Sequence, residues 1–416
     1  MTGEAPASGA GGRPRARGVP WAATLAAMAT GAGASLVAAA GFRPLTRRWP
    51  EAIGASLLAA FATELPRPTA ALTAATAVTA VRRGAARTVP GRLGLGLATA
   101  AVVALLTLDR RARATGQVLA EALGSRRPVA EPPAWLPPRA VTAPRRFRAA
   151  GARDVAYGPH GRENLLDVWR HPDLSRDAGA PVLVEIHGGA WSSGRKEGDA
   201  NPLMSHLVER GWVCVTVNYR LGPGARWPAM IDDVRAALRW VHANVDAHGG
   251  DPGFVAVTGG SAGAHLSALA ALTGEGDTRV DAAVTLYGIY DLTEDDGSGT
   301  LDLLLAETMM PGTLTDDGEA WLAASPAHRV HADAPPFFVL HGTGDAIVVP
   351  EQSRAFVRAL RAVSAHPVAY AELPHAQHGF DLLPTPRTLQ VVRAVEAFLV
   401  DVLGRRPARP GASGAR

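Results

Sequence analysis

The chain has 416 residues, with 42 Lys and Arg against 38 Asp and Glu, so its formal net charge at pH 7 is +4. Its single cysteine excludes a cysteine-ligated metal cluster, and no phosphate-binding loop spacing is present. The chain is longer than one common domain, so we expect more than one structural region.

The N-terminal part contains several uncharged apolar segments. Residues 1–17 carry arginine, glycine and proline and are expected to be disordered. Residues 18–42 then run for 25 positions without a charge, enough for a helix to cross the apolar core of a bilayer. A second uncharged stretch covers 93–108, and two shorter apolar pieces, 52–63 and 69–81, lie between them.

These segments predict an all-α, multi-pass membrane region over residues 18–109, in the cell membrane. A soluble, alanine-rich helical region is the alternative, because Ala and Gly are weak signals for insertion. A cleaved signal peptide is disfavoured because apolar segments continue far beyond the first one. Arginines flank almost every segment, so the positive-inside rule leaves the side of the membrane open.

Residues 110–149 are rich in arginine and proline and are expected to be a linker. The pairs Pro132-Pro133 and Pro137-Pro138 favour extended polyproline structure there. The tail 405–416 is expected to be disordered. The catalytic region has no basic stripe interleaved with aromatics, so we expect lipid headgroups and no nucleic acid as partners. The oligomeric state stays open.

Residues 150–404 alternate apolar, β-branched runs with helical patterns. The expected strands lie near residues 153–157, 164–170, 181–186, 212–218, 254–258, 280–286, 336–341 and 367–372. The expected helices lie near residues 200–210, 229–247, 261–273, 351–364 and 388–403. Such alternation predicts an α/β domain, with a mostly parallel, doubly wound sheet of eight strands.

The stretch Val255–Leu266 contains Gly-x-Ser-x-Gly centred on Ser261, between a strand and a helix. This arrangement is typical of a nucleophile elbow. Gly259 and Gly263 are required because larger side chains there would collide in so tight a turn. The first N–H groups of the helix point toward developing negative charge, so Ser261 is the candidate nucleophile and Ala262 a candidate oxyanion donor.

Further oxyanion donors are expected after the strand at 181–186. That strand ends in His187-Gly188-Gly189-Ala190-Trp191. Glycines directly after a strand leave backbone N–H groups free and let a carbonyl oxygen come close. Gly188 and Gly189 are therefore candidate donors.

A serine nucleophile needs an acid and a base, which follow it in the order Asp, His in this kind of site. After the strand at 336–341 the chain turns through Gly-Thr-Gly to Asp345, the candidate acid. After the strand at 367–372 a loop presents His378, followed by Gly-Phe, as the candidate base. The rivals are His265, His341 and His375 for the base and Glu372 and Asp381 for the acid.

This order of strands and motifs resembles the α/β-hydrolase fold, and the motifs are similar to those of bacterial esterases and lipases of the hormone-sensitive-lipase-like group. The matching stretches are His187–Trp191, Asn218–Leu221, Asp232–Ala237, Gly249–Pro252, Ser325–Ala327 and His378–Phe380. The resemblance implies that Ser261, Asp345 and His378 form the catalytic triad.

Two positions depart from the pattern of that family. Ala190 replaces the usual third glycine of the His-Gly-Gly-Gly motif, and we expect it to narrow the acyl pocket. Gly260 stands where an acidic residue often precedes the serine. Neither departure removes a group that the mechanism needs.

The segment 291–334 is expected to influence substrate choice. Its apolar residues Leu301–Leu305, Met309, Met310 and Trp321 predict either a lid over the serine or a packing helix without a gating role. A lid next to a membrane anchor favours short- to medium-chain or lipid-like acyl esters.

The chain is therefore predicted to be a serine carboxylic-ester hydrolase that works through an acyl-enzyme, with no cofactor and no metal. One alternative is an amide or formamide hydrolase similar to the kynurenine formamidases. Another is a non-catalytic ligand-binding protein on the same fold, which the presence of both Asp345 and His378 disfavours.

Overall fold

The structure, a computed structural model, describes residues 19–48, 50–125, 129, 139–293 and 300–406. The expected disordered N-terminus 1–17, the two proline pairs and nearly all of the tail 405–416 lie outside these residues. The chain divides into two compact units, Met1–Leu36 with Pro68–Ala104 and Val37–Arg67 with Leu105–Arg416.

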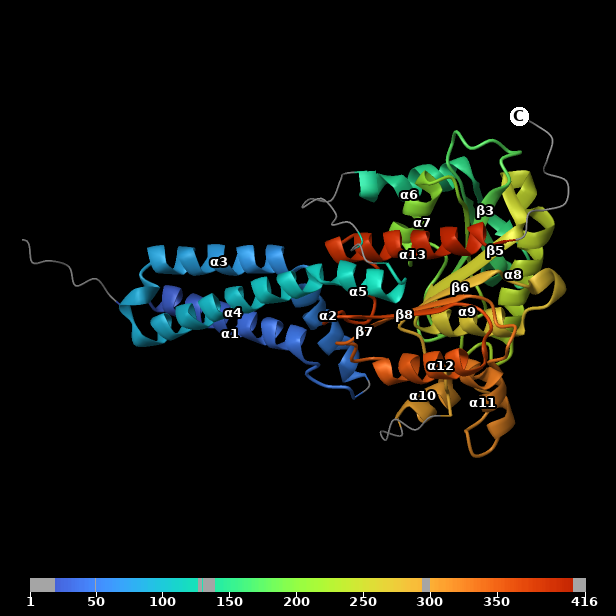
Figure 1. Cartoon of the computed structure of the whole chain (residues 1–416). Helices are drawn as coiled ribbons and strands as arrows, with labels where there is room; N and C mark the ends of the chain where they lie inside the picture. Colours follow the sequence, from blue (N-terminus) through green and yellow to red (C-terminus); the bar gives the residue numbers. More distant parts are fainter. Residues whose placement is uncertain (1–18, 49, 126–128, 130–138, 294–299, 407–416) are drawn as a thin grey trace, which may run out of the picture. The chain divides into compact units, whose positions relative to one another are not determined.

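The first unit consists of helices. It contains most of α1 (Trp21–Phe42) and α3 (Pro66–Arg82), and the first part of α4 (Val89–Arg113). Within this unit the three helices lie side by side (Figure 1). Two helical stretches, Trp21–Phe42 and Val89–Ala122, are long and apolar enough to cross a membrane by length and composition alone, which suggests an anchor or a signal sequence only weakly.

The second unit is built on one sheet. Its strands are β1 (Ala152–Ala156), β2 (Leu165–Trp169), β3 (Ala180–Ile186), β4 (Val213–Val217), β5 (Gly250–Gly260), β6 (Ala282–Leu286), β7 (Phe337–Gly342) and β8 (Val368–Leu373). They are ordered β1-β2-β4-β3-β5-β6-β7-β8. The strands β1 and β2 pair antiparallel with their neighbours and the other pairs are parallel. The predicted eight-stranded, mostly parallel sheet is confirmed.

Strand register brings the predicted loops to one edge of the sheet. Ile186 at the end of β3 pairs with Gly259 of β5, and Gly260 pairs with Leu286 at the end of β6. On the other side of β6, Leu286 pairs with Leu340 of β7. The carboxyl ends of parallel strands meet at the same edge, so the loops that follow them converge there, as in other open α/β sheets.

Helices cover both faces of the sheet, because its strands are apolar on both faces. One core contains residues of α5 (Thr115–Ala122), α6 (Arg139–Ala150), α7 (Asn201–Glu209) and α13 (Pro386–Gly404). The other contains residues of α8 (Ala229–Asn244), α9 (Ala262–Thr273), α10 (Thr300–Thr308), α11 (Gly318–Ala324) and α12 (Pro350–Val363). Figure 1 shows α7 and α13 on one side of the sheet and α9 and α12 on the other.

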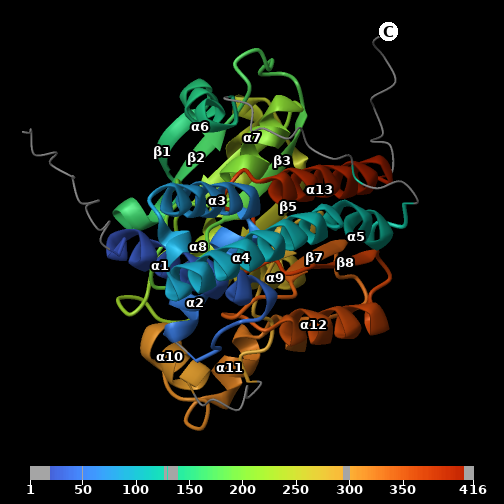
Figure 2. The ribbon, with the colours of Figure 1, turned by 90° about the vertical axis from the view of Figure 1, so that its left-hand side faces the viewer.

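The segment that the sequence predicts to be a linker is structured where it is described. Helix α5 forms within 110–149, α6 extends to Ala150, and the two helices pack on the sheet through Leu119 and Phe147, both buried. Figure 2 shows α5 alongside α13. Burial of apolar side chains such as Leu119 and Phe147 therefore stabilises helices in this segment despite its high content of arginine and proline.

The segment 291–334 contributes to the core. Helices α10 and α11 lie within it, and Leu305, Met309, Met310 and Trp321 are fully buried in the core that also contains residues of α9. These side chains therefore pack in the core, and whether the segment also moves as a lid stays a prediction.

Candidate active site

Ser261 sits at a strained turn between β5 and α9. Its φ is +56°, a left-handed value that non-glycine residues rarely adopt. A Cβ at Gly259 would lie 2.5 Å from the carbonyl oxygen of Ile186, and one at Gly263 would collide with the same oxygen. Both glycines are therefore required by the close approach of β3, and the turn projects Ser261 from the sheet edge.

Asp345 and His378 form a carboxylate–imidazole pair at the ends of β7 and β8. His378 Nδ1 lies 2.7 Å from Asp345 Oδ2. The other carboxylate oxygen accepts N–H groups of Ile347 and Val348, each at 2.9 Å. Asp345 is fully buried, and although burial opposes its ionisation, His378 and His341 lower the pKa of this carboxyl below its usual range. The aspartate is thus ionised and holds the imidazole by one nitrogen.

The other predicted histidines are engaged elsewhere. His341 is fully buried; it contacts Ser353 and the carbonyl of Val348, and its Nε2 lies 3.4 Å from Asp345. His265 is buried between Trp191 and the carbonyl of Ala324. Among the histidines predicted as candidates, His378 alone combines partial exposure with a bond to Asp345.

The two rival acids also have other partners. Glu372 is paired with Arg354 through two bonds of 2.7 Å. Asp381 accepts a short hydrogen bond from the Tyr287 hydroxyl, and burial raises its pKa to about 6. Neither forms a hydrogen bond with His378 in the part of the chain that the structure describes.

Tyr287 connects the elbow to the His378 loop, and the sequence reasoning missed it. Its ring lies 4.6 Å from that of His378, centroid to centroid. Its hydroxyl would lie 2.5 Å from a Cβ placed on Gly260. A glycine at 260 is therefore needed to make room for Tyr287. Its position directly after the strand at 280–286 places it at the edge of the sheet where the catalytic loops meet, and this position could have indicated a role for Tyr287 from the sequence.

In the glycine loop after β3, the predicted oxyanion donor Gly188 has its N–H group bonded to another residue. The N–H of Gly188 donates to Asp199 Oδ2 at 2.7 Å, so this donor is already engaged. Gly189 and Ala190 have positive φ values of 112° and 51°, and their N–H groups have no acceptor among the described residues. Ala262 is the first residue of α9 and has no partner for its N–H inside the helix. Among the described residues, the free backbone N–H groups near Ser261 are thus those of Gly189 and Ala190 in the loop after β3 and of Ala262 at the elbow.

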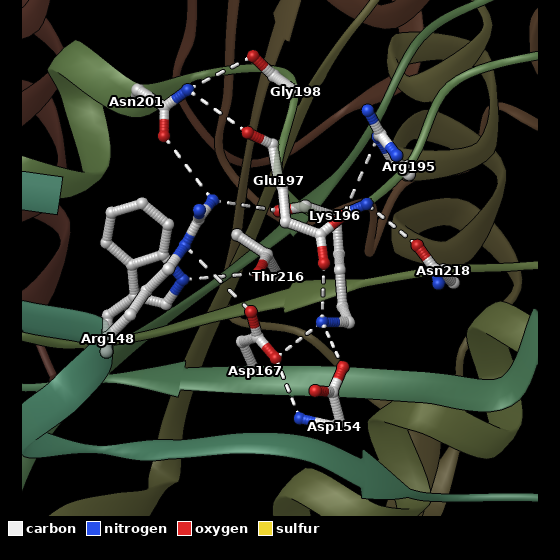
Figure 3. Close-up of polar contacts among 11 residues, drawn as sticks. Arg148, Asp154, Asp167, Arg195, Lys196, Glu197, Gly198, Asn201, Thr216 and Asn218 are labelled. Carbon is white, nitrogen blue, oxygen red and sulfur yellow. Dashed lines mark hydrogen bonds and ion pairs between the residues drawn. The ribbon is translucent and has the colours of Figure 1, made fainter. Parts of the chain in front are cut away.

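A buried charge network holds the segment that carries this loop (Figure 3). Lys196 is 1% exposed, and its ammonium lies 2.6 Å from Asp167 and 2.8 Å from both Asp154 and Glu197. Burial opposes its charge, but these hydrogen bonds prevail and raise the pKa of Lys196. The backbone N–H of Lys196 also donates to Asn218 Oδ1 at 2.7 Å. The network ties the loop after β3 to β1, β2 and the end of β4.

Arg148 of α6 closes the same network from the other side. Its guanidinium lies 4.2 Å from the ring centroid of Trp169 and 3.9 Å from Asp167. It also donates to the carbonyl of Lys196 at 3.4 Å. The sequence reasoning placed Arg148 in a linker and gave no role to Lys196.

The chain is similar to known ester hydrolases. The BD-FAE family profile matches residues 166–360. The probable carboxylic ester hydrolase LipM of Mycobacterium tuberculosis is 43% identical over 390 residues, which cover 87% of this chain and 89% of LipM. Esterase LipQ of the same organism is 48% identical over 64% of this chain and 66% of its own.

A solved structure shows the same fold. The propionate-bound esterase 2 of Thermogutta terrifontis superposes with a TM-score of 0.52 and 23% identity, covering 61% of this chain and 94% of that one. The predicted fold and the predicted ester-bond chemistry are both confirmed. The chain belongs to the α/β-hydrolase carboxylesterases, together with LipM and LipQ, and is a carboxylic ester hydrolase.

Proposed function

We propose that Ser261, His378 and Asp345 carry out ester hydrolysis through an acyl-enzyme. The observation that carries this proposal is the buried carboxylate of Asp345 bonded to His378, in the loops that follow β7 and β8 at the same sheet edge as the elbow. His378 takes the proton of Ser261 as its oxygen attacks the ester carbonyl, then gives it to the leaving alcohol. Water activated by the same histidine releases the acid.

The oxyanion of the tetrahedral intermediate rests on backbone N–H groups. Gly189, Ala190 and Ala262 supply the free donors, and Asp199 fixes the turn by binding the N–H of Gly188. We infer that Gly188 supports the oxyanion hole without donating to it. Loss of one such donor typically costs about 100- to 1,000-fold in rate.

We further propose that the first unit is embedded in a membrane. Its buried side chains are small, and its large apolar side chains face outward. The buried set includes Ala23, Ala27, Ala70, Ala80, Ala85, Ala98 and Ala101, and the exposed set includes Leu25, Met28, Leu36, Leu72, Val78, Val81, Leu93, Leu97 and Val103. This is the reverse of a water-soluble bundle and is typical of helices in lipid, where small residues mediate packing.

Backbone contacts in this unit have the same character. A Cβ at Gly94 of α4 would lie 2.6 Å from the carbonyl group of Ala27 of α1, so the two helix backbones touch. The hydroxyls of Thr73, Thr76, Thr79 and Thr99 each donate to a carbonyl of their own helix, four residues earlier. Polar groups satisfied within a helix suit an apolar solvent. We infer several spans, with lipid as the surrounding phase.

Esters of short- to medium-chain or lipid-like acyl groups are the substrates we propose. The esterase from Thermogutta terrifontis binds propionate, which supports a short acyl group as the first probe. A membrane location supports lipid-like esters as the second.

The Ser261→Ala variant of the full chain tests the mechanism. Hydrolysis of p-nitrophenyl butyrate should fall by about 10⁶-fold, as for other triad nucleophiles, and labelling by a fluorophosphonate should disappear. Ser267→Ala is the matched control, because Ser267 lies in the same helix and its buried hydroxyl has no partner among the described residues. It should keep full activity and labelling.

Turnover that persists in Ser261→Ala would reject the nucleophile. An N-formyl arylamine assayed in parallel tests the amide alternative, and a kcat/KM higher than that for the ester would show that the site prefers amides. An acyl-chain series from acetate to decanoate locates the preferred length.

A further inference from the structure

Two charged side chains are buried where the helical segment 42–64 meets the catalytic region. Glu64, which follows α2 (Glu51–Thr63), is 6% exposed, and Arg387 in the first turn of α13 is 2% exposed. Arg387 Nε lies 3.5 Å from Glu64 Oε1. Both residues belong to the second compact unit. A buried charge persists only with a partner, so each of these residues depends on the other.

Arg387 also contacts the loop that carries His378. It donates to the carbonyl of Pro374 at 3.1 Å, directly after β8, and to the carbonyl of Thr63 at 3.4 Å. On the other side of Glu64, its second oxygen accepts from Thr385, where the loop ends, at 3.3 Å. The Glu64–Arg387 pair therefore touches both ends of the segment Pro374–Thr385, within which His378 lies.

A second contact holds the same loop. His375 Nε2 lies 2.8 Å from Arg111 of α4, and its ring packs edge-on against Phe42 at the end of α1. Its N–H donates to Thr343 on the neighbouring acid loop at 2.8 Å. His375 has a positive φ of 55°, which these contacts must maintain. Residues that precede the catalytic region thus contact the loop directly at His375 and Thr385, and at Pro374 through Arg387.

We propose that Glu64 is a positioning residue for His378, acting through Arg387, and that the helical segment 42–64 is part of the active-site scaffold. This inference rests on the proposed triad. A shift of about 1 Å in a catalytic group can cost about 100-fold in rate. Glu64 orients Arg387, Arg387 holds Pro374, and the loop then presents His378 to Asp345.

The test compares Glu64→Gln with Asp109→Asn in the full chain, purified in detergent. Asp109 is a matched control because it is a carboxylate paired with Arg67 and Arg113 and has no contact with the segment Pro374–Thr385 among the described residues. Fluorophosphonate titration counts functional sites, so kcat per titrated site separates positioning from loss of folded protein. We expect Glu64→Gln to lower kcat per site about 10- to 100-fold with KM within about twofold, and Asp109→Asn to remain near wild type.

Two further readouts distinguish positioning from general damage. The acid limb of the kcat/KM profile should move in Glu64→Gln, because His378 is held differently against Asp345. Arg387→Lys keeps the charge but loses the fork of donors, and should lie between wild type and Arg387→Met in kcat per site.

An unchanged kcat per site with an unmoved acid limb in Glu64→Gln would overturn the positioning role while leaving the triad intact. An equal loss in Asp109→Asn would also overturn it, since the effect would then belong to the helices in general. A wild-type chain without Ser261-dependent turnover would overturn both the triad and this inference.

Discussion

His265 shows how a single buried side chain makes stability depend on pH. It accepts the indole N–H of Trp191 and donates to the carbonyl of Ala324, and burial lowers its pKa to about 4. The unfolded chain has a value of about 6.5. The neutral form in the core therefore contributes stability that is complete above pH 6.5 and is lost as the pH falls toward 4, about 3 kcal/mol in total.

The variant His265→Gln should remove this dependence. Its free energy of unfolding, measured with denaturant between pH 8 and pH 4.5, should start below that of wild type and decline less in acid. His366→Gln is the control, because His366 is exposed and should keep the slope of wild type. If the free energy of unfolding declines equally with falling pH in wild type and in His265→Gln, His265 is not the cause of the acid sensitivity.

At the scale of elements, the network around Lys196 joins the loop after β3 to the first strands. Removing the ammonium in Lys196→Met leaves Asp167 fully buried with Arg148 at 3.9 Å and the N–H of Asp154 as its remaining partners. Breaking a buried pair from one side typically costs about 3–5 kcal/mol. We expect a loss of that size in the free energy of unfolding.

The matched control is the exposed pair Arg405–Asp401, at 2.8 Å in the last turn of α13. Arg405→Met should cost less than about 1 kcal/mol, as for other surface pairs. The double variant Lys196→Met with Asp167→Leu should recover part of the loss, because it leaves no unpaired carboxylate. If Lys196→Met lowers the free energy of unfolding as little as Arg405→Met does, the Lys196–Asp167 pair does not stabilise the fold.

At the scale of the whole molecule, the outward-facing leucines of the first unit test its environment. Leu93→Lys combined with Leu97→Lys places two charges on an exposed apolar face of α4. A lysine costs about 2.5–3.5 kcal/mol at the centre of a membrane helix and less toward its ends, so Leu97→Lys should contribute more than Leu93→Lys, which follows Arg92. The variant should leave the membrane fraction on carbonate extraction, while wild type stays in it.

Leu322→Lys combined with Val363→Lys is the control for added charge. Both positions are exposed on the catalytic region, in α11 and at the end of α12. This variant should remain in the membrane fraction with wild type. Retention of the Leu93, Leu97 variant would show that this face of α4 does not contact lipid.

The strands and the elbow could be predicted because their causes are local. An apolar strand such as 181–186 is recognised from its own residues, and the elbow is recognised from the Gly-x-Ser-x-Gly spacing around Ser261, although the collision that excludes a side chain at Gly259 and Gly263 comes partly from Ile186 of β3. The order Ser, Asp, His then selected Asp345 and His378, which the structure brings to 2.7 Å of each other. The sequence alone therefore predicted the features that depend on residues close together in the chain.

Other roles depend on residues that are distant in the chain. The N–H of Gly188 is taken by Asp199, Tyr287 fills the space left at Gly260, and Glu64 meets Arg387. The sequence of each residue's own segment gives no sign of these contacts, because a charge or a hydroxyl can be solvated in one fold and buried in another. The sequence by itself determined the fold, the chemistry and the candidate triad. Only the tertiary structure decided which donors are free and what holds the histidine loop, since burial and long-range pairing arise when the elements pack together.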